Sequence, residues 1–318
     1  MVLSSTSRPS MESTPDAPSH MNGSFPNSQP AEIISIYVSL FITLLGTAGN
    51  ALVIWFLLFP FKKNPFTVYI LHLSIADLTF LLCISTIHTG IIIFYNFNIQ
   101  SFALRSFLII FYMMVLFGYN TGLFLLTAIS VERCLSVLYP SWYKCQRLKH
   151  QSAIVCTLLW VLSVFVSLLG FLCLWATEPK FPFRPCTVVE VFLLILNFLV
   201  FAPLMVFSNL ILFIKVFCHL KHHQPDKIYI IIITTVLLFL FFAMPLRVVV
   251  MMYNFKDENY ESLRLLRPYV NILSIINSTV NPIVYLVVGG IRRKRTRKSL
   301  KDTLQRVFED KPHSRMRS

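Results

Sequence analysis

The chain has 318 residues, of which 56% are hydrophobic and 13% are charged, and its mean hydropathy is +0.68. This composition excludes an ordinary soluble globular protein, in which roughly a quarter of the residues are charged. The net charge of +14 does not indicate a nucleic-acid-binding protein, because the basic residues lie between apolar segments and in the carboxyl-terminal tail.

Apolar segments recur along most of the chain, and a helix of about 20 such residues crosses a bilayer. We predict seven spans, near residues 33–59, 66–93, 102–135, 152–175, 188–216, 228–253 and 269–288. The predicted fold class is an all-α membrane protein with a seven-transmembrane helix bundle. Residues 1–31 are expected to form an extracellular disordered tail, residues 32–290 the bundle, and residues 291–318 a basic cytoplasmic tail.

The orientation is predicted from charge. Most of the 28 Lys and Arg residues lie on one side of the predicted bundle, so the positive-inside rule places the amino terminus outside and the carboxyl terminus in the cytoplasm. Asn22, in Asn22-Gly23-Ser24, is then a predicted glycosylation site. The basic inner face would attract anionic membrane lipid. Apolar residues at helical spacing predict an amphipathic surface helix in the tail: Leu300, Leu304, Val307 and Phe308.

Several polar residues lie inside the predicted spans, where lipid offers no hydrogen-bond partners. They are Asn50, Asp77, Asn120, Asn277, Ser278 and Asn281. Such residues often join helices to one another, and this is the preferred interpretation of Asn50. Asp77 differs, because a lone buried carboxylate must be protonated, paired or bound to a cation.

A charged pair ends the third span, and a proline motif lies in the seventh. A charge at mid-bilayer costs about 2.5–3.5 kcal/mol on insertion scales, so Glu132 and Arg133 are expected at the membrane edge. The motifs in order are Gly49-Asn50, Asp77, Glu132-Arg133-Cys134, Trp160 and Asn281-Pro282-Ile283-Val284-Tyr285. Together they resemble the rhodopsin-like G-protein-coupled receptors. The stretch 117–140, followed by Trp142-Tyr143, resembles Mas and the Mas-related receptors, and Mas most strongly.

The resemblance implies a plasma-membrane receptor that binds an extracellular peptide or small-molecule ligand and activates a heterotrimeric G protein. It implies no enzymatic activity and no cofactor, and we find no nucleophile–base pair or phosphate-binding loop in the sequence. The residues implied as the activation switch are Asp77, Glu132, Arg133, Pro245, Asn277, Asn281, Pro282 and Tyr285. On activation Tyr285 would move toward Arg133, and spans three, six and seven would part on the inner side.

Three positions depart from the pattern of the class. Ala243 stands where a tryptophan usually precedes the proline of span six, so the common aromatic switch is missing. Gly122 stands where a hydroxyl usually helps to hold sodium beside Asp77, so the resemblance does not support a sodium site, although a polar network is expected. No cysteine lies near the top of span three, and the usual disulfide from there cannot form. No metal site is predicted.

Two cysteines, Cys173 and Cys186, are predicted on the outer, oxidising side of the membrane. We predict that they form a disulfide, which Mas-related receptors have in place of the usual one; the alternative is that one of them is a buried thiol. On the chain-entropy model, closing the short loop between Cys173 and Cys186 adds about 2–3 kcal/mol to the free energy of unfolding.

Arg247 is the main candidate for ligand contact, since a charge inside a span marks a functional site by default. A guanidinium binds carboxylate or phosphate through paired hydrogen bonds, and the alternative is an internal ion pair with Glu190. Glu190 also resembles an acidic position that holds cationic ligands in some Mas-related receptors, although Leu169 replaces its companion acid. The predicted ligand-binding residues are Arg247, Glu190, Tyr112, Phe192, Met251 and Tyr269.

Two other functions remain open from the sequence. One is a constitutively active receptor or scaffold without a ligand. The other is a transporter or light-driven pump, which the chain supports poorly: span seven has no lysine to hold retinal, and we find no internal repeats of the kind transporters show.

Overall fold

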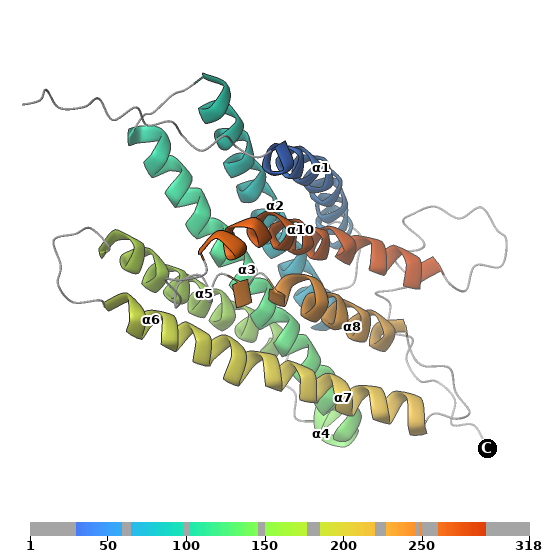
Figure 1. Cartoon of the computed structure of the whole chain (residues 1–318). Helices are drawn as coiled ribbons and strands as arrows, with labels where there is room; N and C mark the ends of the chain where they lie inside the picture. Colours follow the sequence, from blue (N-terminus) through green and yellow to red (C-terminus); the bar gives the residue numbers. More distant parts are fainter. Residues whose placement is uncertain are drawn as a thin grey trace, which may run out of the picture.

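In the computed structural model, all regular secondary structure in the described part of the chain is helical (Figure 1). The described residues are 30–58, 65–97, 102–145, 150–176, 185–219, 227–245, 248–249 and 260–290. The helices are α1 (Pro30–Leu58), α2 (Pro65–Phe97), α3 (Phe102–Leu138), α4 (Pro140–Cys145), α5 (Gln151–Ala176), α6 (Pro185–Leu194), η1 (Ile195–Phe201), α7 (Ala202–His219), α8 (Lys227–Leu238), η2 (Phe239–Ala243) and α10 (Tyr260–Gly290).

Four helices begin at a proline. Pro30, Pro65, Pro140 and Pro185 occupy the first positions of α1, α2, α4 and α6. Proline suits this position because its fixed φ matches the helix, and because the N–H that it lacks would have no helical partner there. The local sequence therefore determines where these helices start.

Five helices are long and apolar enough to cross a membrane by length and composition: Glu32–Leu58, Phe66–Phe94, Ser106–Leu138, Gln151–Leu172 and Val191–Lys215. A shorter apolar helix runs over Tyr229–Ala243. α6, η1 and α7 follow one another without a break and form the fifth predicted span, and α8 and η2 lie in the sixth. We call the segment of α8, η2, Met244 and Pro245 span six.

The seventh predicted span differs from the observed helix at its start. α10 begins at Tyr260, whereas the apolar pattern predicted a start near residue 269. The first turns of α10 contain Glu261 and Arg264, which interrupt an apolar pattern but not a helix. Pro268 and Pro282 both lie within α10, so neither proline ends it.

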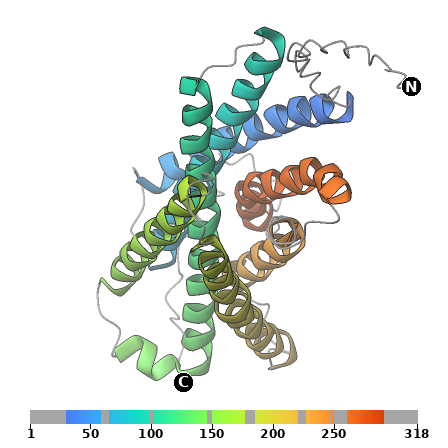
Figure 2. The same ribbon diagram turned by 60° about the vertical axis from the view of Figure 1, so that its left-hand side comes forward.

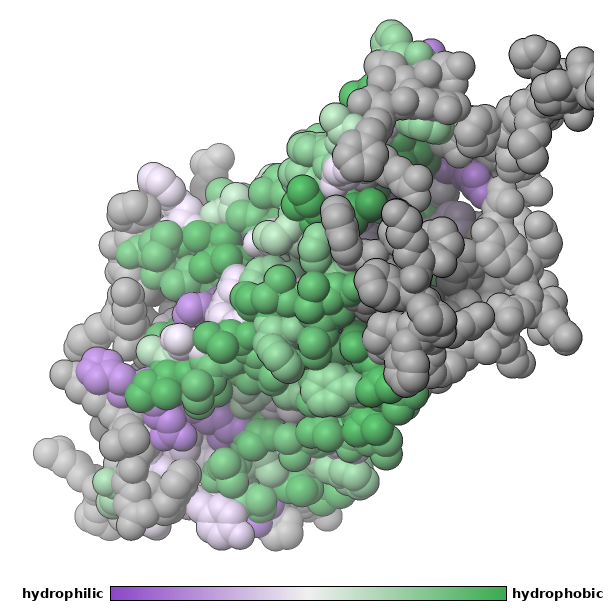
Figure 3. Space-filling model, turned by 90° about the vertical axis from the view of Figure 1, so that its left-hand side faces the viewer, coloured by the Kyte–Doolittle hydropathy of each residue, from purple (hydrophilic) through white to green (hydrophobic). Residues whose placement is uncertain are grey.

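The outer surface of the bundle is hydrophobic, as the space-filling view in Figure 3 shows for one face. Large apolar side chains are strongly exposed on several helices, including Trp55 (61%), Leu158 (62%) and Phe241 (71%). A soluble monomer rarely exposes so much contiguous apolar surface, whereas lipid tails match it. The helices and this surface confirm the prediction of an all-α membrane protein.

α3 runs through the middle of the bundle, where it packs against α2, α5 and α7 (Figures 1 and 2). Leu123, Phe124 and Leu125 are consecutive and fully buried, so this stretch of α3 contacts protein on every side. A helix that is apolar all round is expected in such a central position. Side chains on α3 can therefore reach most of the other helices.

Two glycines let α1 approach α10 closely. A Cβ atom added at Gly46 would overlap Thr279 and would lie 2.8 Å from Leu81 Cδ1. A Cβ atom at Gly49 would lie 3.2 Å from Pro282 Cβ. Small residues commonly mark the contact between transmembrane helices, because they allow the backbones to come together.

We expect Gly46→Ala to lower the thermal stability of the purified receptor. The new methyl group forces α1 away from α10, which lowers the free energy of unfolding by about 1–3 kcal/mol. The matched control is Gly170→Ala, where an added Cβ meets nothing within 4 Å. Both changes gain the same helix propensity, so the difference between their melting temperatures isolates packing. Equal melting temperatures would contradict the close approach.

Candidate functional site

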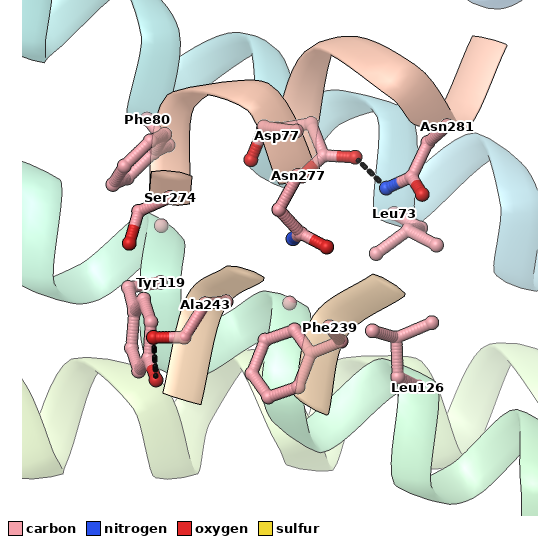
Figure 4. A pocket seen from close by; sticks show the side chains of 13 residues that line it. Leu73, Asp77, Phe80, Tyr119, Leu126, Phe239, Ala243, Ser274, Asn277 and Asn281 are labelled. Carbon is pink, nitrogen blue, oxygen red and sulfur yellow. Dashed lines mark hydrogen bonds between the residues drawn. The ribbon is translucent and has the colours of Figure 1, made fainter. Parts of the chain in front are cut away.

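Asp77 lies at the centre of a polar cluster between α2 and α10. It is 5% exposed, and Asn281 Nδ2 donates a hydrogen bond of 2.7 Å to its Oδ2 atom (Figure 4). The hydroxyl of Ser278 also bonds the carboxylate. Asn277 and Asn281 are four residues apart on α10 and so share one face of the helix. The spacing in the sequence therefore places both amides on the side of α10 that faces Asp77.

Asn50 joins the same cluster to α1. Its Nδ2 atom donates to the carbonyl oxygens of Gly46 and Ser278, each at 3.0 Å. The second bond links α1 to α10, so the interpretation of Asn50 as a contact between helices is confirmed.

A cavity adjoins Asp77 and is bounded by α2, α3, η2 and α10. Its polar lining includes Asp77, Asn277 and Asn281, and its apolar lining includes Leu126 and Phe239 (Figure 4). The Oδ1 atoms of Asn277 and Asn281 are buried and have no hydrogen-bond partner in the described part of the chain. Both are acceptors, so the cavity can take a hydrogen-bond donor.

The cavity is open beside Gly122, the position where the resemblance implied a hydroxyl near Asp77. Gly122 lines the cavity, and a Cβ atom added there would meet nothing within 4 Å. Open space thus stands where a hydroxyl was expected, and sodium binding beside Asp77 stays unsupported by the residue at this position.

The charged end of α3 forms a second cluster, which we call the Arg133 end. Tyr143 Oη, on α4, donates a hydrogen bond of 3.0 Å to Glu132 Oε1, and Tyr69 on α2 is hydrogen-bonded to the same carboxylate. Arg133 is half-buried, with its guanidinium carbon 4.8 Å from the centre of the Phe66 ring. The two neighbours therefore contact different residues, in agreement with their adjacent positions on one helix.

The remaining predicted switch residues lie along spans six and seven. Tyr285 is fully buried on α10, one turn beyond Asn281, and Pro282 lies between them. Pro245 follows the π-helical segment η2. Their roles in activation stay predictions.

The predicted ligand pocket is only partly described. Tyr112 is half-buried on α3, whereas Phe192 on α6 and Tyr269 on α10 are 41% and 58% exposed. No interaction joins these three side chains among the described residues. Arg247 and Met251 lie outside the described residues, and the side chain of Glu190 does also.

The predicted disulfide and glycosylation site are likewise untested. Cys173 lies in α5 and Cys186 in α6, and neither side chain is among those that the structure describes. Asn22 lies outside the described residues.

Sequence reasoning missed Tyr119, whose hydroxyl donates to the carbonyl oxygen of Ala243 at 3.2 Å. It also missed Tyr69, Tyr143 and Phe66 as the neighbours of Glu132 and Arg133. The sequence contained one indication of a contact such as that of Tyr119. The small residue at 243 requires a side chain from another helix to fill the space beside it.

Comparison with known proteins identifies the class. Residues 49–285 match the family "7 transmembrane receptor (rhodopsin family)". The chain is 57% identical over 276 residues to Mas-related G-protein coupled receptor member H of Mus musculus, which covers 86% of this chain and 83% of the relative. It is 41% identical over 295 residues to proto-oncogene Mas of Homo sapiens, which covers 92% and 89%.

The chain therefore belongs to the rhodopsin family of seven-transmembrane receptors and, within it, to the Mas-related G-protein-coupled receptors. This confirms the resemblance and the predicted fold class; of the two relatives, member H is more similar than Mas. Receptors of this class are multi-pass plasma-membrane proteins, not enzymes, and they act through ligands and G proteins.

We expect Asp77→Ala to be less thermostable than Asp77→Asn by about 1–3 kcal/mol, because only asparagine keeps an acceptor for Asn281 Nδ2. Asp77→Asn also removes a buried carboxylate and should melt no lower than the wild type. Thermal unfolding of the purified receptors measures both differences. If Asp77→Ala and Asp77→Asn had the same melting temperature, the hydrogen bond between Asp77 and Asn281 would contribute nothing to thermal stability.

Proposed function

We propose that this protein is a cell-surface receptor whose amino terminus is outside the cell and whose Arg133 end engages a heterotrimeric G protein in the cytoplasm. Membership of the Mas-related receptors supports a signalling role. The observation that carries the proposal is the arrangement at the Arg133 end, where Glu132 is held by two tyrosines and Arg133 by an aromatic face.

The contacts of Arg133 suit a residue that changes partner. A cation–π contact is worth about 0.5–2 kcal/mol, which the interactions of a bound protein can replace. Glu132 is 8% exposed and keeps its tyrosine neighbours from α2 and α4. Arg133 can therefore turn away from Phe66 while Glu132 stays in place.

The ligand is proposed to bind at the opposite end of the bundle. Arg247 would bind an anionic group of the ligand. The rest of the site would be formed by Glu190, Tyr112, Phe192, Met251 and Tyr269. A disulfide between Cys173 and Cys186 would hold the adjoining outer loop. An extracellular peptide or small molecule with a carboxylate or phosphate fits a guanidinium best. Such a ligand activates the receptor if it binds the open state more tightly than the resting state.

We expect Arg133→Ala to abolish second-messenger signalling in cells, at surface expression matched to the wild type. The signal would be elicited with fractionated extracellular peptides and acidic metabolites. Phe66→Leu keeps apolar bulk but removes the ring face over which Arg133 lies, so it should retain signalling and raise the basal level, because Arg133 is then held less firmly. An undiminished response from Arg133→Ala would contradict the proposal. High basal signalling that no fraction changes, lost in Arg133→Ala, would instead indicate a constitutive receptor.

We expect Arg247→Ala to shift the dose–response curve of an active anionic fraction to roughly 10- to 100-fold higher concentration, since a charged hydrogen bond contributes about 1.5–3 kcal/mol. Glu190→Ala and the double variant separate ligand contact from an internal ion pair. For an ion pair, the shift of the double variant would equal that of either single variant. Unchanged potency of the fraction in Arg247→Ala would show that Arg247 does not contribute to ligand binding.

A further inference from the structure

Tyr119 makes a hydrogen bond from α3 to span six. Its Oη atom lies 3.2 Å from the carbonyl oxygen of Ala243 and 3.9 Å from Met244 Sδ. Its ring lies against Phe239, with 5.8 Å between the ring centres. Tyr119 is 8% exposed and Ala243 is 1% exposed, so the bond is shielded from solvent (Figure 4).

The acceptor of this bond lies where span six departs from a regular α-helix. Ala243 is the last residue of the π-helical segment η2, and Met244 N–H bonds back to the Phe239 carbonyl in the π-helical register. Pro245 follows directly and has no N–H to offer. π-Helical turns and prolines are the usual places where a transmembrane helix can change its bend. Tyr119 therefore attaches α3 to the point of span six that is best suited to move.

The small side chains at 243 and 122 make room for this contact. The methyl group of Ala243 leaves space in which the Tyr119 ring can lie between α3 and η2. Gly122, almost one turn further along α3, leaves the adjoining cavity open. Tyr119 and Ala243 line this cavity, and the bond between Asp77 and Asn281 borders it from α2 and α10. Movement at Tyr119 would therefore alter the surroundings of the polar cluster.

Neighbouring hydroxyl groups of α3 are used differently. Thr121 Oγ1 donates to the Phe117 carbonyl at 2.8 Å, within its own helix. Thr127 Oγ1 lies 2.9 Å from the Leu123 carbonyl and 3.4 Å from that of Phe201, so its single proton is used mainly within α3. Tyr119 is distinguished from both by a donor group that reaches span six.

We propose that Tyr119 is a positioning residue for signalling, whose hydrogen bond to the Ala243 carbonyl holds span six against α3 in the ligand-free receptor. The proposal rests on the signalling function proposed above. Span six can part from α3 only after the bond to Tyr119 breaks.

The first test measures the restraint without any G protein. Hydrogen–deuterium exchange of residues 239–244 would be compared in ligand-free receptors in lipid nanodiscs. Tyr119→Phe keeps the ring and loses the hydroxyl, so we expect exchange to rise about two- to tenfold, as the loss of a typical hydrogen bond implies. Thr121→Val is the matched control, because it loses a hydroxyl that bonds only within α3, and its exchange should stay unchanged.

The second test measures basal second-messenger signalling in cells at matched surface expression. We expect Tyr119→Phe to raise it two- to tenfold, Thr121→Val to leave it unchanged, and Arg133→Ala to abolish the increase when combined with Tyr119→Phe. Ala243→Val is an independent variant, since the larger side chain displaces the tyrosine, and it should act in the same direction in both tests.

Each outcome decides the proposal. Increases in both measurements, in Tyr119→Phe or Ala243→Val, would support it. Unchanged exchange would overturn it, as would faster exchange with unchanged basal signalling in a receptor whose signal depends on Arg133. If signalling did not depend on Arg133, the proposed function would fail, whereas the exchange measurement would still decide whether Tyr119 holds span six.

Discussion

A carboxylate inside a lipid bilayer must find its partners within the protein, and Asp77 imposes this requirement on the whole bundle. Asn281 and Ser278 meet it from α10, and Asn50 joins α10 to α1 through a backbone carbonyl. Three helices are thus held by polar contacts that lipid cannot replace. The glycines of α1 are needed for the same reason, because only a close approach of α1 to α10 brings Asn50 within reach of the Ser278 carbonyl.

The helices of the bundle differ in how regular they are. α1, α2 and α3 are long regular helices, whereas the fifth and sixth spans contain the π-helical segments η1 and η2, each followed by a proline. α3 contacts both irregular segments through Phe124 and Phe201 on one side and Tyr119 and Phe239 on the other. A rigid central helix beside two deformable spans allows a change at one end of the bundle to appear at the other.

Much of this could be predicted from sequence, because the relevant signals are local. Apolar length gave most of the spans, prolines explain several helix starts, and the spacing of Asn277 and Asn281 placed both amides on one face of α10. What could not be predicted depends on contacts between distant segments. Glu132 and Arg133 are adjacent in the chain, yet their partners Tyr69, Tyr143 and Phe66 come from other helices. No periodicity in the sequence encodes such pairings, and the same holds for the π-helical turn before Pro245.

The positions 119, 122 and 243 are best understood together. Position 243 has an alanine where the resemblance implied a tryptophan. The smaller side chain alone would leave a void, and the atoms that line a void in a packed interior lose contacts. Tyr119 fills the space beside Ala243 from the opposite helix and adds a hydrogen bond to a carbonyl next to a proline. At Gly122, by contrast, the space stays open beside the buried amide oxygens. The chain thus closes one gap with a polar contact between helices and keeps the other as a cavity. A movement of span six would therefore alter the lining of that cavity, because Phe239 and Ala243 of span six both line it.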